Sequence, residues 1–99
     1  MSAFSVTSIK LREAAEEINR LNGQFMNTRE ELVTAESALK TMWEGAANEA
    51  FHAAFTRDTG QMEAFYSEMT RYAQALETIA VKYEEAERRN EQLSSARSY

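Results

Sequence analysis

Residues 11–42 of the chain read LREAAEEINRLNGQFMNTREELVTAESALKTM, and the spacing of their apolar side chains decides the fold class. These side chains recur at alternating steps of three and four, a mean period of about 3.5 that is typical of a coiled-coil helix. Thr28 is the one polar member of this stripe, whose apolar members are Leu11, Ala14, Ile18, Leu21, Phe25, Leu32, Ala35, Leu39 and Met42.

A second stretch repeats the same spacing. Its stripe consists of Phe51, Phe55, Asp58, Met62, Phe65, Met69, Tyr72, Leu76, Ile79, Tyr83, Ala86, Asn90 and Leu93. The period of two that marks a strand is sustained nowhere, and the chain has no proline that would break a helix. We therefore predict an all-α single domain over residues 1–99, with helices over 8–43 and 46–93, Thr7 as the first N-cap, and a flexible tail over 94–99.

The segment Trp43-Glu44-Gly45 lies between the two stretches. Glycine is the preferred residue at a helix C-terminus, because the left-handed conformation there carries no Cβ penalty. So short a connection predicts an antiparallel helical hairpin in which the numbers of facing residues sum to about 89, which sets Phe25 level with Phe65. The second helix then outruns the first beyond residue 83. Gly23 and Gly60 lie opposite the stripes and are expected to weaken their helices without ending them.

Further apolar or small residues flank both stripes, so each helix has an apolar face wider than a two-helix contact needs. Those residues are Ala15, Met26, Val33, Tyr66, Ala73 and Ala80. We expect two hairpins to dimerise into a four-helix bundle, although scattered exposed apolar groups on a monomer are a common alternative. The predicted packing and dimer face consists of Leu11, Ile18, Leu21, Phe25, Leu32, Leu39, Phe51, Phe55, Met62, Phe65, Met69, Tyr72, Leu76 and Ile79.

Composition narrows the function. With 11 Lys+Arg against 16 Asp+Glu, the net charge of −5 argues against nucleic acid as a partner. No apolar run approaches the roughly 18 residues of a membrane span. Residues 1–10 lack the basic start and apolar run of a cleavable signal peptide, so we expect any export to use another route.

Little in the sequence supports catalysis or metal binding. The chain has no cysteine, and His52 is its only histidine. Glu49-Ala50-Phe51-His52 has the Glu-x-x-His spacing of di-metal bundles, but such sites need two copies and further carboxylates. We therefore predict no catalytic residue, no metal and no cofactor, and expect His52 to be solvated near the bend.

The run Trp43-Glu44-Gly45-Ala46-Ala47-Asn48-Glu49-Ala50-Phe51 resembles the signature of the Trp-X-Gly (WXG, ESAT-like) family of small helical-hairpin proteins, which are type VII secretion substrates. Trp43, Gly45, Ala47 and Phe51 occupy the signature positions. The resemblance implies a non-enzymatic protein exported as a folded dimer. Its implied partners are a second copy (homodimer) or a related hairpin (heterodimer), a secretion-system ATPase as export receptor, and a larger co-secreted effector.

The resemblance also implies a location: cytoplasmic before export, then secreted without a cleavable signal peptide. The alternative function is an intracellular adaptor or chaperone that pairs with a larger toxin or effector and targets it for secretion. Trp43 has two interpretations, an apolar cap over the end of the hairpin and a recognition element at its tip.

Some branches of that family carry a Tyr-x-x-x-Asp/Glu export signal late in the second helix, and Tyr83-Glu84-Glu85-Ala86-Glu87 matches it. The spacing of four places Tyr83 and Glu87 side by side on one face of a helix. Alternatively, Tyr83 continues the apolar stripe and packs against Phe4 or Val6. Asn90, where the repeat calls for an apolar residue, makes the end of the second helix less regular.

Overall fold

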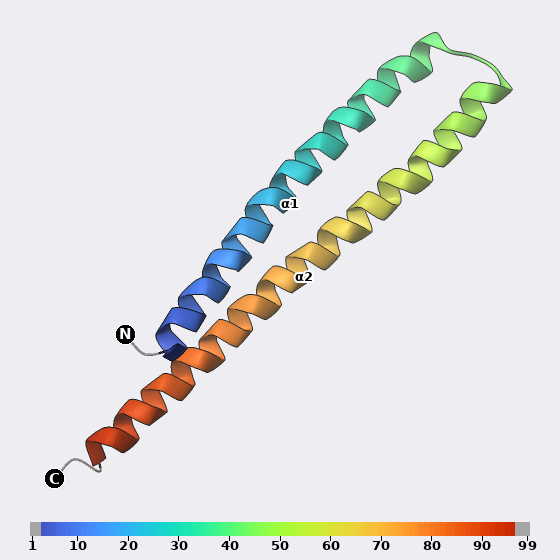
Figure 1. The fold of residues 1–99 in the computed structure, drawn as a ribbon. Coiled ribbons are helices and arrows are strands. Elements are labelled where there is room, and N and C mark those ends of the chain that lie inside the picture. The colour runs from blue at the N-terminus through green and yellow to red at the C-terminus, as the bar shows by residue number, and fades with distance from the viewer. Residues whose placement is uncertain (1–2, 97–99) are drawn as a thin grey trace. The chain divides into compact units, whose positions relative to one another are not determined.

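The computed structural model describes residues 3–96, and it consists of two long α-helices (Figure 1). Helix α1 spans Ala3–Met42 and helix α2 spans Ala46–Ala96, with residues 43–45 between them. The described part of the chain contains no strand. The predicted all-α fold is confirmed.

Helix α1 begins before its predicted start at residue 8 and ends at Met42 instead of residue 43, whereas α2 extends beyond its predicted end at residue 93. α1 begins at Ala3, so Thr7 lies within the helix and is not its N-cap. α2 continues through Ser94 to Ala96, and residues 97–99 of the predicted tail lie outside the described residues. Once a helix has formed, each added residue gains a backbone hydrogen bond. A serine in the helix lowers its stability by only about 0.5 kcal/mol relative to alanine. Residues 3–7 and 94–96 contain no proline or glycine that would stop this propagation.

The chain divides into two compact units. Unit 1 joins the start of α1, up to Asn19, to the end of α2 from Thr70 onward, and unit 2 comprises Arg20–Met69 with the bend. Within each unit the segments of α1 and α2 run antiparallel (Figure 1). In unit 1 the last turns of α2 extend past the first turn of α1, as predicted for the second helix.

Cross-helix contacts in unit 2 fix the register. Asn22 bonds to Tyr66, Arg29 to Thr59, and Glu36 to His52, and the residue numbers of each pair sum to 88. The rings of Phe25 and Phe65 lie 5.1 Å apart between centroids. The predicted pairing of Phe25 with Phe65 is therefore confirmed.

The most buried residues recur every seventh position along both helices, and we call this line the seam. They are small or polar: Ser8, Ala15, Asn22 and Glu36 on α1, and Thr59, Ala73 and Ala80 on α2. Arg29, whose side chain is only 16% exposed, falls on the same line. Small side chains at a helix contact let the two backbones approach closely.

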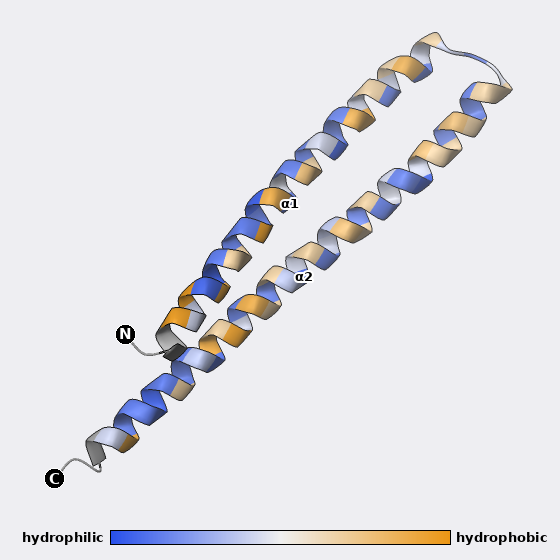
Figure 2. Ribbon diagram, viewed as in Figure 1, coloured by the Kyte–Doolittle hydropathy of each residue, from blue (hydrophilic) through white to orange (hydrophobic). Residues whose placement is uncertain are grey.

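The seam is not the apolar stripe that the sequence pattern put between the helices. With about 100° of turn per residue, the stripe positions lie roughly 60° and 100° around each helix from the seam. Many of their large side chains remain between 38% and 77% exposed: Leu21, Leu32, Leu39, Met42, Phe51, Phe65, Tyr72, Ile79 and Leu93. Apolar residues recur along both helices, whereas the end of α2 is mostly hydrophilic (Figure 2).

The stripes of both helices turn toward the same side of unit 2. Viewed along the chain direction, each stripe is rotated from its own seam in the same sense. When two such helices pair antiparallel with their seams facing each other, both stripes therefore lie on one face of the pair. The 5.1 Å contact between Phe25 of α1 and Phe65 of α2 agrees with this. We call this surface the apolar face of unit 2, consisting of Leu21, Phe25, Leu32, Leu39, Met42, Phe51, Phe55, Met62 and Phe65.

Candidate functional site

The bend is built around Gly45. Its φ of 115° is a backbone conformation that residues with a Cβ rarely adopt, which explains the glycine. The backbone N–H groups of Asn48 and Glu49 donate to its carbonyl at 3.1 and 3.2 Å, so Gly45 is the N-cap that precedes α2. The prediction that it would end α1 in the left-handed conformation is corrected: α1 already ends at Met42, three residues earlier.

Three aromatic side chains follow one another from the bend into α2. The ring of Trp43 lies 5.7 Å from that of Phe51 and tilted by 46°, and Phe51 stacks on Phe55 at 6.1 Å. The Asn48 side chain donates to the Trp43 carbonyl, which ties the bend to the first turn of α2. Trp43 is half-buried and Phe51 is exposed, so the aromatic row remains accessible beside the bend.

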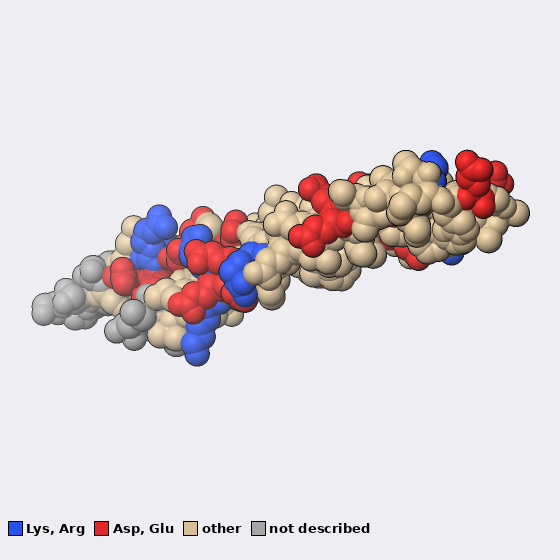
Figure 3. Space-filling view, turned by 90° about the horizontal axis from the view of Figure 1, so that it is seen from above, with Lys and Arg blue, Asp and Glu red and all other residues tan. Residues whose placement is uncertain are grey.

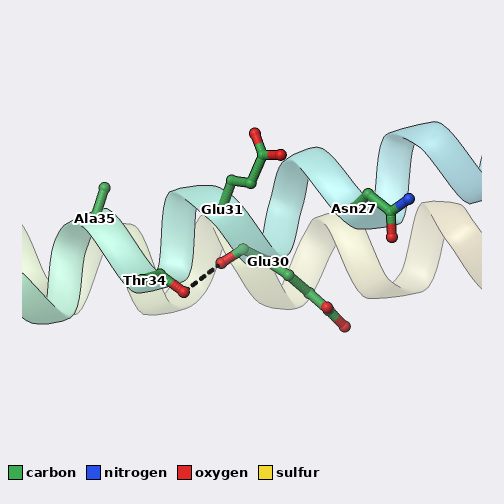
Figure 4. Close-up of a pocket in the computed structure, with 5 residues that line it drawn as sticks. All are labelled: Asn27, Glu30, Glu31, Thr34 and Ala35. Carbon is green, nitrogen blue, oxygen red and sulfur yellow. Dashed lines mark hydrogen bonds between the residues drawn. The ribbon is translucent and has the colours of Figure 1, made fainter.

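The described surface of unit 2 includes a shallow hollow on each of two faces. One is on the apolar face, where Phe25, Met62 and Phe65 line it together with Asp58 and Gln61. The other lies along α1 alone, between Asn27, Glu30, Glu31, Thr34 and Ala35, all exposed (Figure 4). Within it the Thr34 hydroxyl donates to the Glu30 carbonyl at 3.0 Å, a bond internal to the helix. Only the first hollow belongs to a surface built from both helices.

Polar side chains of α1 bond across the seam to α2, and we call Asn22, Arg29 and Glu36 the polar ladder. The Asn22 side-chain amide donates to the Tyr66 carbonyl at 3.0 Å. The Arg29 Nε donates to the Thr59 carbonyl at 3.0 Å, and its guanidinium lies 2.9 Å from the Glu63 carboxylate. The Glu36 carboxylate, on a side chain 7% exposed, contacts Nδ1 of His52.

This contact corrects the expectation for His52. Its side chain is 39% exposed and pairs with Glu36 from the other helix, so it is not simply solvated near the bend. The Glu-x-x-His spacing gathers no metal ligands either. Within residues 3–96, no three His, Asp or Glu side chains are grouped so that they could hold a metal ion.

The polar ladder was not predicted from the sequence. Asn22, Arg29 and Glu36 are spaced by seven, as are His52 and Thr59. This heptad spacing of polar residues beside the apolar stripe was the available signal.

Tyr83 and Glu87 lie one turn apart on α2 in unit 1, and both are half-buried. Of the two packing partners considered for Tyr83, Val6 is exposed and the side chain of Phe4 lies outside the described residues. Beside Tyr83, the Glu84 carboxylate accepts from Arg12 of α1; this hydrogen bond and the carboxylate charge raise the pKa of Arg12. Figure 3 shows acidic and basic side chains interspersed over the described part of unit 1.

A Trp-x-Gly bend between two long helices that pair antiparallel within each unit defines a class of small helical-hairpin proteins. The family WXG100, described as proteins of 100 residues with WXG, matches residues 3–88, and this chain belongs to it. Searches among curated proteins and among solved structures found no match. Over residues 3–96, neither helix has a segment apolar enough to cross a bilayer.

Proposed function

We propose that this protein is a small non-enzymatic factor, exported in folded dimeric form by a type VII secretion system as a secreted protein or co-secretion partner. Membership of the WXG100 family supports the secretion route. The apolar face of unit 2 supports the dimer, and this surface is the observation that carries the proposal. A membrane-anchored ATPase of the secretion system is the proposed export receptor.

The apolar face needs a partner of matching character. Burying the exposed half of a Leu or Phe side chain contributes about 1 kcal/mol, so nine such residues supply a free energy comparable with the roughly 4–15 kcal/mol cost of association. A second hairpin that presents the same face would complete a four-helix bundle. The occupant is a second copy of this chain or a related hairpin.

A charge placed on the apolar face tests the dimer. We expect the mass of the purified protein measured by light scattering to be twice that of the chain, and Leu32→Asp to reduce it to one chain. The matched control is Thr34→Asp, an exposed change two residues away. A protein that is a well-folded monomer at micromolar concentration would show that this face does not bind a second copy.

The export step is tested in the native host. We expect Tyr83→Ala combined with Glu87→Ala to abolish accumulation in the culture supernatant while the helical circular dichroism of the purified variant is retained. Glu85→Ala with Glu91→Ala, two exposed positions of the same segment, is the control. Export that is unaffected by the first pair would refute the export signal.

The adaptor function gives a different outcome in the same cells. An intracellular adaptor or chaperone would stay in the cytosol and co-purify in a fixed ratio with one large toxin or effector. That result would replace the secreted-factor proposal. The hairpin and its apolar face would remain as described.

A further inference from the structure

Unit 2 buries polar residues and exposes apolar ones, the reverse of what a hairpin alone requires. On α1 the seam positions hold Asn22, Arg29 and Glu36, while Leu21, Leu32 and Leu39 are 38–49% exposed. Burial of apolar surface is the main favourable term in folding. Burial of apolar surface between the two helices therefore does not explain this arrangement, and another interaction must favour it.

A second arrangement of the same helices is available. Turning each helix by roughly 60–100° about its own axis would bring the two apolar stripes together and put the present seam in water. Both arrangements keep the antiparallel register, because the stripes and the seam share the same heptad spacing. A hairpin turned in this way would cover Leu32, Leu39 and Phe65 without a partner.

The polar ladder distinguishes the two arrangements. Its three members reach α2 at three successive heptads: a carbonyl of Tyr66, a carbonyl of Thr59 with the Glu63 carboxylate, and the ring of His52. All of these contacts require the seams to face each other. Turning the helices would separate every pair, and directional hydrogen bonds of this kind set orientation more strictly than apolar contacts do.

We propose that Asn22, Arg29 and Glu36 are positioning residues that hold unit 2 with its apolar face outward, available to a second hairpin. This inference depends on the proposed function in one respect only, namely that a second hairpin covers the apolar face. The ladder prevents the two helices of one hairpin from burying their apolar stripes against each other. That surface is then buried only when two hairpins associate.

The test replaces the ladder with apolar residues in the full chain: Asn22→Leu, Arg29→Met and Glu36→Leu together. Folding is expected to survive, because the Tyr66 and Thr59 carbonyls lie inside α2, where they accept helical hydrogen bonds, and Glu63 and His52 are 61% and 39% exposed. The control adds the same residues on the far side of α1: Asn27→Leu, Thr34→Met and Thr41→Leu, all at exposed positions.

The reactivity of a single introduced cysteine thiol shows whether the apolar side of α1 is covered. The chain has no cysteine, so Leu32→Cys on the apolar face introduces a single reactive site in each background. Its alkylation rate by iodoacetamide is measured over a range of protein concentrations, alongside the mass by light scattering. With the natural ladder, we expect fast alkylation at low concentration that slows as the mass doubles, and the same from the control.

The ladder variant is expected to behave differently in both measurements. Its thiol should react at least tenfold more slowly at the lowest concentration, with no dependence on concentration, and its mass should stay that of one chain. Alkylation at the rate of the natural ladder, with the mass still doubling, would overturn the proposal. If the triple variant loses its helical circular dichroism, Arg29→Met alone is measured: slowing beyond the control supports the positioning role, and a rate equal to the control overturns it.

The two proposals fail separately. A mass that never doubles with the natural ladder refutes the dimer. The difference in alkylation rate between the two backgrounds still decides whether the ladder orients the helices.

Discussion

Replacement of glycine by alanine should destabilise the protein at Gly45 and stabilise it at Gly23 and Gly60. At Gly45 an added Cβ would meet no atom within 4 Å, so its whole effect comes from the φ of 115°. Holding a residue with a side chain in such a conformation costs about 1–3 kcal/mol. Gly45→Ala should therefore lower the free energy of unfolding by that amount.

Gly23 and Gly60 provide the matched controls within the same chain. Both lie inside helices, and an added Cβ again meets nothing within 4 Å. Alanine is favoured over glycine in a helix by about 1 kcal/mol, so Gly23→Ala and Gly60→Ala should each stabilise the protein. One kcal/mol corresponds to roughly 4–8 °C in Tm for a domain of this size.

The assay is urea unfolding followed by circular dichroism, with protein concentration held fixed because association would shift the midpoint. The expected order of midpoints is Gly60→Ala and Gly23→Ala above the natural protein, and Gly45→Ala below it. A midpoint for Gly45→Ala equal to or above that of the natural protein would show that the bend does not require a positive φ. The account of the Trp-x-Gly turn given above would then be wrong.

The remaining predictions concern the seam and its neighbours. Ala73→Leu should destabilise the protein by about 1–3 kcal/mol because it overpacks a fully buried position, whereas Ala75→Leu, two residues away and exposed, should be nearly neutral in thermal unfolding. His52→Ala should cost about 1–3 kcal/mol because it leaves the buried Glu36 carboxylate without its partner, and adding Glu36→Ala should recover part of that loss; a strictly additive double-mutant cycle would contradict the pairing. Glu84→Gln should leave Tm unchanged at physiological salt, because the Arg12–Glu84 pair is exposed to solvent. Because Glu84 raises the pKa of Arg12, the guanidinium stays charged throughout the neutral and alkaline range, so a clear fall in stability between pH 7 and 10 that disappears in Arg12→Gln would contradict this assignment.

Helix type and pairing register could be read from residue types alone. The 3.5-residue spacing from Leu11 to Met42 distinguishes a helix from a strand without any tertiary contact, because only the period matters. The short Trp-Glu-Gly connection then fixes which residues lie level, and the Phe25–Phe65 contact agrees with it. The helix ends were less predictable: Thr7 and Ser94 lie inside helices because cooperative propagation outweighs weak local preferences.

The candidate site was only partly predictable. Trp43 and Gly45 could be found from their motif, and the stripe residues such as Leu32 and Phe65 from their spacing. The pairing of His52 with Glu36 could not, because the heptad spacing marks both residues but does not say which polar residues face each other until the helices are placed side by side.

The sequence by itself determined that this chain forms two antiparallel helices with a glycine at the bend, since period, propensity and loop length are local properties. Only the tertiary structure decided which side of each helix faces the other. A heptad pattern has the same period for the stripe and for the seam, so the pattern cannot choose between them. In unit 1 the close packing at Ala15, Ala73 and Ala80 accompanies that choice. In unit 2 the directed bonds of Asn22, Arg29 and Glu36 accompany it, and the apolar residues of that unit face outward.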